Sequence, residues 1–252
     1  MDMKNTVALI TGASRGIGAA AAIALARAGV KVALAARTTA DKPSRIPGTL
    51  DATVERIRAL GGEALAVPTD VTDDEQVVAM VRTTEAHFGR VDFLVNNAGI
   101  NFFQGFDIPM KRFDVMLRVN LRAPFIAVKE VLPGMVQRGF GRIVNVSSET
   151  AHAFYPGAVS YGMQKAGMDR MTRDIAHYYA RHGIAANSFS IDLEVPTEGY
   201  LSNAEYVKTG EASPALAGEC IAWMLRQPAA YSGVIEPMSL LIEREQLRDP
   251  AP

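Results

Sequence analysis

Tyr161 and Lys165 have the residue types and spacing that proton transfer to an oxygen requires. Four positions apart, they share one face of a helix. A phenol is a weak acid at neutral pH, and a nearby ammonium group stabilises its phenolate. The pair therefore favours general acid–base chemistry on an alcohol or a carbonyl. An ordinary surface pair has the same spacing, so these two residues alone leave both interpretations open.

Polar residues directly follow two apolar runs of strand type. Ser147 and Ser148 follow residues 142–146, and the sequence NNAG at 96–99 follows residues 91–95. Ligands bind at the carboxyl ends of the strands in an open parallel sheet, where a serine hydroxyl can donate to a carbonyl oxygen. Ordinary turns also use serine, asparagine and glycine, so a structural role remains an alternative.

The segment TGASRGIG at 11–18 joins the first apolar run to an alanine-rich helical segment. Glycines let the backbone turn sharply and approach a pyrophosphate, and the helix start offers free N–H groups to an anion. The spacing is G-x-x-x-G-x-G rather than the more common G-x-G-x-x-G. Its place after the first strand predicts a dinucleotide site.

These groups need elements that position them, and the chain alternates strand-type and helical segments. Strands are expected at 6–10, 31–36, 64–67, 91–95, 142–146 and 185–189, with a last one within 234–242. Helices are expected at 18–28, 49–60, 73–88, 111–138 with a kink at Pro124, 161–181 and 214–225. The alternation predicts an α/β fold, a single Rossmann-type doubly wound parallel sheet over 1–252, with a short substrate lid near 190–213.

Composition narrows the function classes. The chain has 252 residues, a formal net charge of -1 and one cysteine, Cys220. This charge argues against a nucleic-acid partner, and one cysteine excludes an internal disulfide framework. Cys220 is expected to be a small buried residue. We expect no metal. We also expect no membrane span and a cytoplasmic location, because no apolar run is long enough for a bilayer and residues 1–12 do not resemble a signal peptide.

Several motifs occur together in one order: TGASRGIG at 11–18, Asp70-Val71, NNAG at 96–99, Asn120, GRIVNVSS at 141–148 and YGMQK at 161–165. On these motifs the sequence resembles the classical short-chain dehydrogenase/reductase family over nearly its whole length. Residues 36–57 are also similar to the hydroxysteroid-dehydrogenase-like branch of that family. The resemblance implies an oxidoreductase that moves a hydride between a nicotinamide dinucleotide and an alcohol/carbonyl pair.

The resemblance also implies roles for individual residues. The family's catalytic serine lies thirteen positions before its tyrosine, which selects Ser148 over Ser147. Tyr161 would be the acid in reduction and the base in oxidation, Lys165 would hold the ribose and lower the pKa of the tyrosine, and Asn120 would hold a relay water. The expected cofactor-binding residues are Gly12, Ser14, Arg15, Gly16, Ile17, Gly18, Arg37, Asp70, Val71, Asn97, Ala98, Gly99, Tyr161, Lys165, Val195 and Thr197.

The sequence departs from the family after residue 189. Ile191 and Asp192 stand where the family usually has Pro-Gly, and Thr197 comes one position late. The final segment also lacks the usual Asp-Gly-Gly. Because this region normally holds the nicotinamide carboxamide, we assign that role to Val195 and Thr197. The departures concern the shape of the pocket more than the chemistry.

The end of the second expected strand bears on the choice of cofactor. Members that prefer NAD have an acid there for the ribose 2′-hydroxyl, whereas this chain has Ala36 followed by Arg37. Arg15 adds a second cation, and Lys42 and Arg45 lie in the next loop. Guanidinium groups suit a 2′-phosphate. We therefore expect NADP(H) in preference to NAD(H), the alternative being that Arg37 is a solvated loop charge.

Candidate pocket residues follow the fourth and fifth expected strands: Ile100, Phe102, Phe103, His152, Phe154 and Tyr155. They suit a hydrophobic ketone, aldehyde or alcohol as the small-molecule partner. Ordinary packing beneath the loops is an equal alternative for these residues, and for His152 the alternative is a structural role. Two other functions remain open, a redox-sensing NADP-binding protein and an epimerase or lyase. The apolar faces of 111–138 and 161–181, with the resemblance, predict a homo-oligomer, most simply a tetramer.

Overall fold

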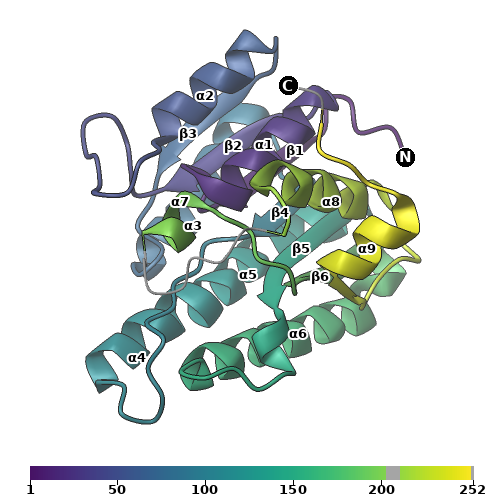
Figure 1. The fold of residues 1–252 in the computed structure, drawn as a ribbon. Helices are drawn as coiled ribbons and strands as arrows, with labels where there is room; N and C mark the ends of the chain where they lie inside the picture. Colours follow the sequence, from purple (N-terminus) through teal and green to yellow (C-terminus); the bar gives the residue numbers. More distant parts are fainter. Residues whose placement is uncertain (203–210, 251–252) are drawn as a thin grey trace.

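The computed structural model describes residues 1–202 and 211–250, so residues 203–210 of the expected lid lie outside the described residues. One seven-stranded parallel sheet runs through the molecule in the order β3-β2-β1-β4-β5-β6-β7 (Figure 1). The strands are β1 (Val7–Thr11), β2 (Lys31–Ala36), β3 (Ala64–Pro68), β4 (Phe93–Asn96), β5 (Gly141–Ser148), β6 (Ile184–Ile191) and β7 (Ile235–Pro237). The strand order reverses between β1 and β4, which opens a crevice at the carboxyl ends of the strands.

Helices cover both faces of this sheet, which confirms the Rossmann-type doubly wound fold. One face carries α1 (Gly16–Arg27), α2 (Leu50–Ala59), α8 (Pro214–Arg226) and α9 (Met238–Glu245). The other carries α3 (Asp74–Phe88), α5 (Ala123–Arg138) and α6 (Val159–Tyr179). Two short helices, α4 (Met110–Leu117) and α7 (Glu198–Leu201), lie toward the carboxyl ends of the strands.

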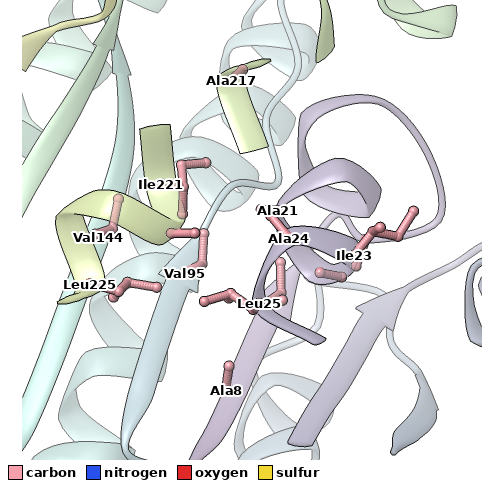
Figure 2. Close-up of a cluster of buried hydrophobic side chains, with 14 of the residues drawn as sticks. Ala8, Ala21, Ile23, Ala24, Leu25, Val95, Val144, Ala217, Ile221 and Leu225 are labelled. Atoms are coloured by element: carbon pink, nitrogen blue, oxygen red, sulfur yellow. The ribbon is translucent and has the colours of Figure 1, made fainter. Parts of the chain in front are cut away.

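The alanine-rich sequence of α1 is explained by close packing against the sheet and α8. Figure 2 shows the side chains of α1, α8 and the central strands meeting in one apolar cluster. Ile221 and Leu225 of α8 are fully buried there. A Cβ added at Gly218 would lie 2.6 Å from the backbone of Ala20, so the two helices approach closely. Each large apolar side chain buried in this way stabilises the fold by roughly 1.5–3 kcal/mol.

The helix expected over 111–138 is interrupted. It consists of α4, a π-helical segment η1 (Arg118–Arg122) and α5. Pro124 follows η1 without a break in the helical backbone, and it offers no N–H to the carbonyl groups of the preceding turn. The irregularity is thus a π turn before the proline, and it contains Asn120.

The final strand expected within 234–242 is confirmed as the short β7, and residues 238–245 form α9 instead of continuing it. Asp192 accounts for this helix start, since its carboxylate accepts hydrogen bonds from the backbone N–H of Ser239 at 3.0 Å and from the Ser239 hydroxyl. Ile191 extends β6 and pairs with Ser148 of β5. The two residues that replace the expected Pro-Gly therefore have structural roles.

Candidate active site

Ser148 ends β5 and caps a short 3-10 turn, η2 (Glu149–Ala151). It is partly exposed, whereas its neighbour Ser147 is buried, because both faces of β5 are covered by helices and Ser148 is the last residue of the strand. The Ser148 Oγ accepts from the Thr150 N–H at 3.3 Å and lies 3.1 Å from the Thr150 hydroxyl, which donates to it. The proton of Ser148 is then available to donate to a substrate oxygen.

The helix α6 places Tyr161 and Lys165 together. The Lys165 Nζ lies 5.3 Å from the centre of the Tyr161 ring and donates to the backbone oxygen of Val146 at 2.6 Å. Lys165 is buried, and Tyr161 is partly exposed. The pair therefore lies against β5, the strand that contains Val146, and is not a surface pair.

Burial controls the acidity of both groups. It raises the pKa of Tyr161 to about 12 and lowers the pKa of Lys165 to about 8, where the Asp169 carboxylate partly opposes the lowering. In this structure burial is the cause of the raised pKa of Tyr161, and the Lys165 ammonium donates to the Val146 oxygen; the expected lowering of the phenol pKa by Lys165 stays a prediction. A phenol with a raised pKa stays protonated at neutral pH, which suits an acid that protonates a carbonyl oxygen.

Asn120 lies in the π turn η1 and is buried. Its Oδ1 accepts from the Ile100 N–H at 2.9 Å, and its Nδ2 donates to the Ile100 oxygen and to Gln164 Oε1, both at 2.8 Å. A Cβ added at Gly99 would lie 3.6 Å from Asn120 Oδ1 and 3.7 Å from Lys165 Nζ. Asn120 therefore joins the segment after β4 to α6, beside Lys165.

The glycine-rich turn and the NNAG segment form one unit. Gly12 has a φ of +69°, a conformation that favours glycine. A Cβ added at Gly18 would lie 2.5 Å from Asn97 Nδ2, and this amide donates to the Thr11 oxygen at 2.9 Å. The Thr11 hydroxyl accepts from the N–H groups of Asn97 and Ala98. Side chains larger than hydrogen do not fit at Gly12 and Gly18, so the backbone itself forms the cradle at these positions.

An anion already lies at the start of α1. Glu198 Oε2 accepts from the Gly16 N–H at 2.9 Å, and the N-cap residue Arg15 forms no side-chain cap there. A Cβ added at Gly16 would lie 3.1 Å from the side chain of Thr197, so α7 lies beside the start of α1 (Figure 1). A helix N-terminus that holds a carboxylate suits the pyrophosphate of a dinucleotide.

The second cation, Arg15, lies near the end of β2 as the sequence suggested, but its guanidinium is engaged by the loop that follows. The Arg15 guanidinium donates to the oxygens of Pro47, Thr38, Ser44, Ile46 and Gly48 at 2.7–3.2 Å, so it holds the loop 38–48. Arg37 follows the last residue of β2, is exposed, and forms no hydrogen bond or ion pair with any other residue in 1–202 or 211–250. Arg37 is therefore a cation with free donors directly after β2.

The remaining expected cofactor residues lie along the same crevice. Asp70 follows β3, and its carboxylate accepts from the N–H and hydroxyl of Thr72. Val71 is partly buried beside it, Ser14 is buried in the glycine-rich turn, and Val195 is buried before α7. Thr197 caps α7 by accepting from the Tyr200 N–H at 3.2 Å, so it lies nearer the glycine-rich turn than its expected carboxamide role implied.

The expected pocket residues are only partly brought together. The rings of Phe103 and Tyr155 lie 6.2 Å apart, and Phe102 lies beneath the Arg112 guanidinium at 5.2 Å. Phe154 is 90% exposed, and Ile100 is partly exposed. His152 is not a free pocket group, because its Nε2 lies 2.9 Å from Asp169 Oδ2.

Sequence reasoning missed four residues that hold the site: Thr150, Gln164, Asp169 and Glu198. The first has a local signal, since a threonine two residues after a serine is typical of a capped turn. The others bond to groups far away in the chain.

Within the described part of the chain, no cluster of metal ligands occurs and no helix is long and apolar enough to cross a membrane. Cys220 is buried, as expected.

Comparison with known proteins agrees with this architecture. Residues 6–192 match the family model described as short chain dehydrogenase. The chain is 39% identical over 186 residues to a 3-oxoacyl-[acyl-carrier-protein] reductase of Synechocystis sp., covering 72% of this chain and 71% of that one. It is 31% identical over 245 residues to hydroxysteroid dehydrogenase-like protein 2 of Danio rerio, covering 95% of this chain and 58% of that one.

A solved metagenomic short-chain oxidoreductase in complex with NADP has the same fold. Its TM-score is 0.78 at 27% identity, with 94% of this chain and 96% of that one covered. The chain belongs to the short-chain dehydrogenase/reductase family. It is accordingly an oxidoreductase of a family that uses a nicotinamide cofactor.

Proposed function

We propose that this protein interconverts a hydrophobic ketone or aldehyde and its alcohol with NADP(H). The observation that carries the proposal is the placement of Tyr161 and Lys165 on one face of α6, with the partly exposed Ser148 on the neighbouring strand. NADP(H), when bound, supplies the hydride in reduction and accepts it in oxidation. The glycine-rich turn at 11–18 fits the pyrophosphate, because it is a cradle without room for a Cβ and already binds a carboxylate.

The chain's own residues have distinct tasks in carbonyl reduction. The Ser148 hydroxyl donates to the carbonyl oxygen and holds it, because Thr150 already donates to Ser148. The Tyr161 phenol gives its proton to that oxygen as the hydride arrives, and in oxidation it takes the proton back. The Lys165 ammonium, buried beside the ring, stabilises the phenolate left after proton transfer.

A hydrophobic substrate is supported by the residues around the crevice. The rings of Phe103 and Tyr155 lie tilted against each other between the loops that follow β4 and β5, and Phe102 and Phe154 add exposed aromatic surface. Apolar walls with a few polar groups are typical of pockets for small organic ligands. The segment near 190–213, which includes α7, is proposed as the lid over this pocket.

Tyr161→Phe tests the mechanism, since it removes the phenol proton and keeps the ring. We expect turnover to fall by about 10²-fold or more with cofactor affinity unchanged, measured by NADPH absorbance over a panel of ketones and aldehydes. Tyr178→Phe, an exposed phenol on the same helix, is the control and should keep full activity. A Tyr161→Phe enzyme with normal turnover would refute the mechanism, and a wild type that binds NADPH without net consumption would indicate a sensor, epimerase or lyase.

We also propose a homotetramer located in the cytoplasm. Support for assembly comes from a groove between α4, α5 and α6 with exposed apolar residues such as Phe125 and Tyr178. Large exposed apolar patches mark interaction sites. Light scattering at micromolar concentration should give four times the monomer mass, and a strict monomer would refute the proposal.

A further inference from the structure

The turn that carries Ser148 rests against α6 at two points. We call residues 148–153 the serine turn. At one end, the backbone oxygen of Thr150 lies so close to Gly162 that a Cβ added there would be 2.5 Å away. At the other end, His152 Nε2 lies 2.9 Å from Asp169 Oδ2. These points lie seven residues apart on α6, hence on one side of the helix.

Asp169 has surroundings that a carboxylate rarely occupies. Its side chain is 3% exposed, and its Oδ1 is buried without a hydrogen-bond partner among the described residues. Among the described residues, the His152 ring makes the hydrogen bond to this carboxylate; with the carboxylate ionised, Nε2 is the donor, because an ionised carboxylate only accepts. Burial of a carboxylate costs several kcal/mol unless it is paired. Its presence four residues after Lys165 therefore calls for a role.

Building on the proposed carbonyl reduction, we propose that His152 and Asp169 are positioning residues that fasten the serine turn to α6 and so hold Ser148 in register with Tyr161. The two catalytic groups belong to different elements, β5 with its turn and α6, so a link between the elements sets their relative position. Small displacements of such groups lower turnover strongly, because the reacting geometry is narrow.

Asp169 also acts on Lys165 by its charge. The groups that face the Lys165 Nζ are Asp169 and the Tyr161 ring from α6, the Val146 oxygen from β5, and the Gly99 backbone with Asn120 on the other side. Asp169 is the charged group among them. Its carboxylate opposes the lowering of the pKa of Lys165 that burial causes.

A kinetic double-mutant cycle tests the positioning role. We expect His152→Ala to lower kcat about three- to tenfold and to leave the KM for NADPH within about twofold. In a Ser148→Ala background the same change should lower kcat by less than about twofold, because there is no Ser148 hydroxyl left to position. Equal losses in both backgrounds, or no loss in wild type, would overturn the proposal. His177→Gln, an exposed imidazole on α6, is the matched control and should change nothing.

A pH profile separates Asp169 from a purely structural residue. In Asp169→Asn the alkaline limit of kcat should move to lower pH, because Lys165 loses the charge that holds its proton, and Asp169→Glu should restore part of the shift. An unchanged limit in Asp169→Asn would overturn the electrostatic role.

Amide hydrogen exchange tests the link without any substrate. His152→Ala should speed exchange over residues 148–153 and leave the glycine-rich turn unchanged. If wild type shows no carbonyl turnover, the proposed function fails, and this exchange measurement still decides the link: unchanged exchange over residues 148–153 would overturn it.

Discussion

The edge of the cofactor crevice offers the sharpest test of cofactor choice, through the double variant Ala36→Asp with Arg37→Ala. In the structure, Arg37 has free donors beside the end of β2, while Arg15 is committed to the loop 38–48. With NADP(H) as the proposed cofactor, one guanidinium would therefore contact the 2′-phosphate, rather than two. A charge-assisted hydrogen bond contributes roughly 1.5–3 kcal/mol. Because Arg37 is exposed, solvent screening reduces this to about 1–1.5 kcal/mol.

That free energy corresponds to a preference for NADPH over NADH of about tenfold in kcat/KM, since ~1.4 kcal/mol is a factor of ten. The double variant should reverse the preference, because it removes the guanidinium and adds a carboxylate that accepts from a free 2′-hydroxyl and repels a phosphate. The wild-type preference should also weaken as salt rises, since the screening length falls from about 10 Å at 0.1 M to about 3 Å at 1 M.

The assay is kcat/KM with both cofactors at a fixed carbonyl substrate, in wild type and variant. Arg173→Ala removes an exposed cation on α6, a helix outside the loop 38–48, and should leave the ratio unchanged. Equal efficiency with NADH and NADPH in wild type would refute the reasoning, because Arg37 would then be a solvated surface charge.

Three further outcomes are expected. Gly18→Ala should weaken cofactor binding at least about tenfold and lower the melting temperature, because its Cβ would collide with Asn97. Gly105→Ala, which has open space around it, is the control and should change neither quantity. Titration of NADPH fluorescence measures binding and calorimetry measures the melting temperature, and normal binding by Gly18→Ala would contradict the proposed cradle. Glu198→Gln should tighten NADPH binding about two- to fivefold, because it removes a carboxylate that competes with the pyrophosphate for the start of α1. Weaker binding in the same titration would instead show that Glu198 helps to hold the cofactor. Reductive kcat should decline above about pH 8, where Lys165, whose pKa burial lowers to about 8, loses its proton; a flat profile to pH 10 would contradict this.

Local patterns explain what the sequence predicted well. The β-α alternation identified the sheet and the succession of helices, because periods of two and 3.6 residues are properties of short segments. Helix α3 illustrates this, since Asp73 at its start and Gly89 at its end are readable signals, and the structure has both caps. In the final segment the strand was predicted but α9 was not, because an apolar run of helix length and a strand look alike over a few residues, and Asp192, far earlier in the chain, binds the first turn of α9.

The sequence alone determined the family, the sheet and the residues whose types suit hydride and proton transfer, because those motifs are contiguous or share one helix face. Only the tertiary structure decided how they are supported. Glu198 meets Gly16 across 182 positions, and Arg15 reaches the loop near Pro47 across 32. His152 reaches Asp169 only because the serine turn folds back onto α6. Such contacts depend on how distant elements pack together, and no local period or spacing encodes that packing.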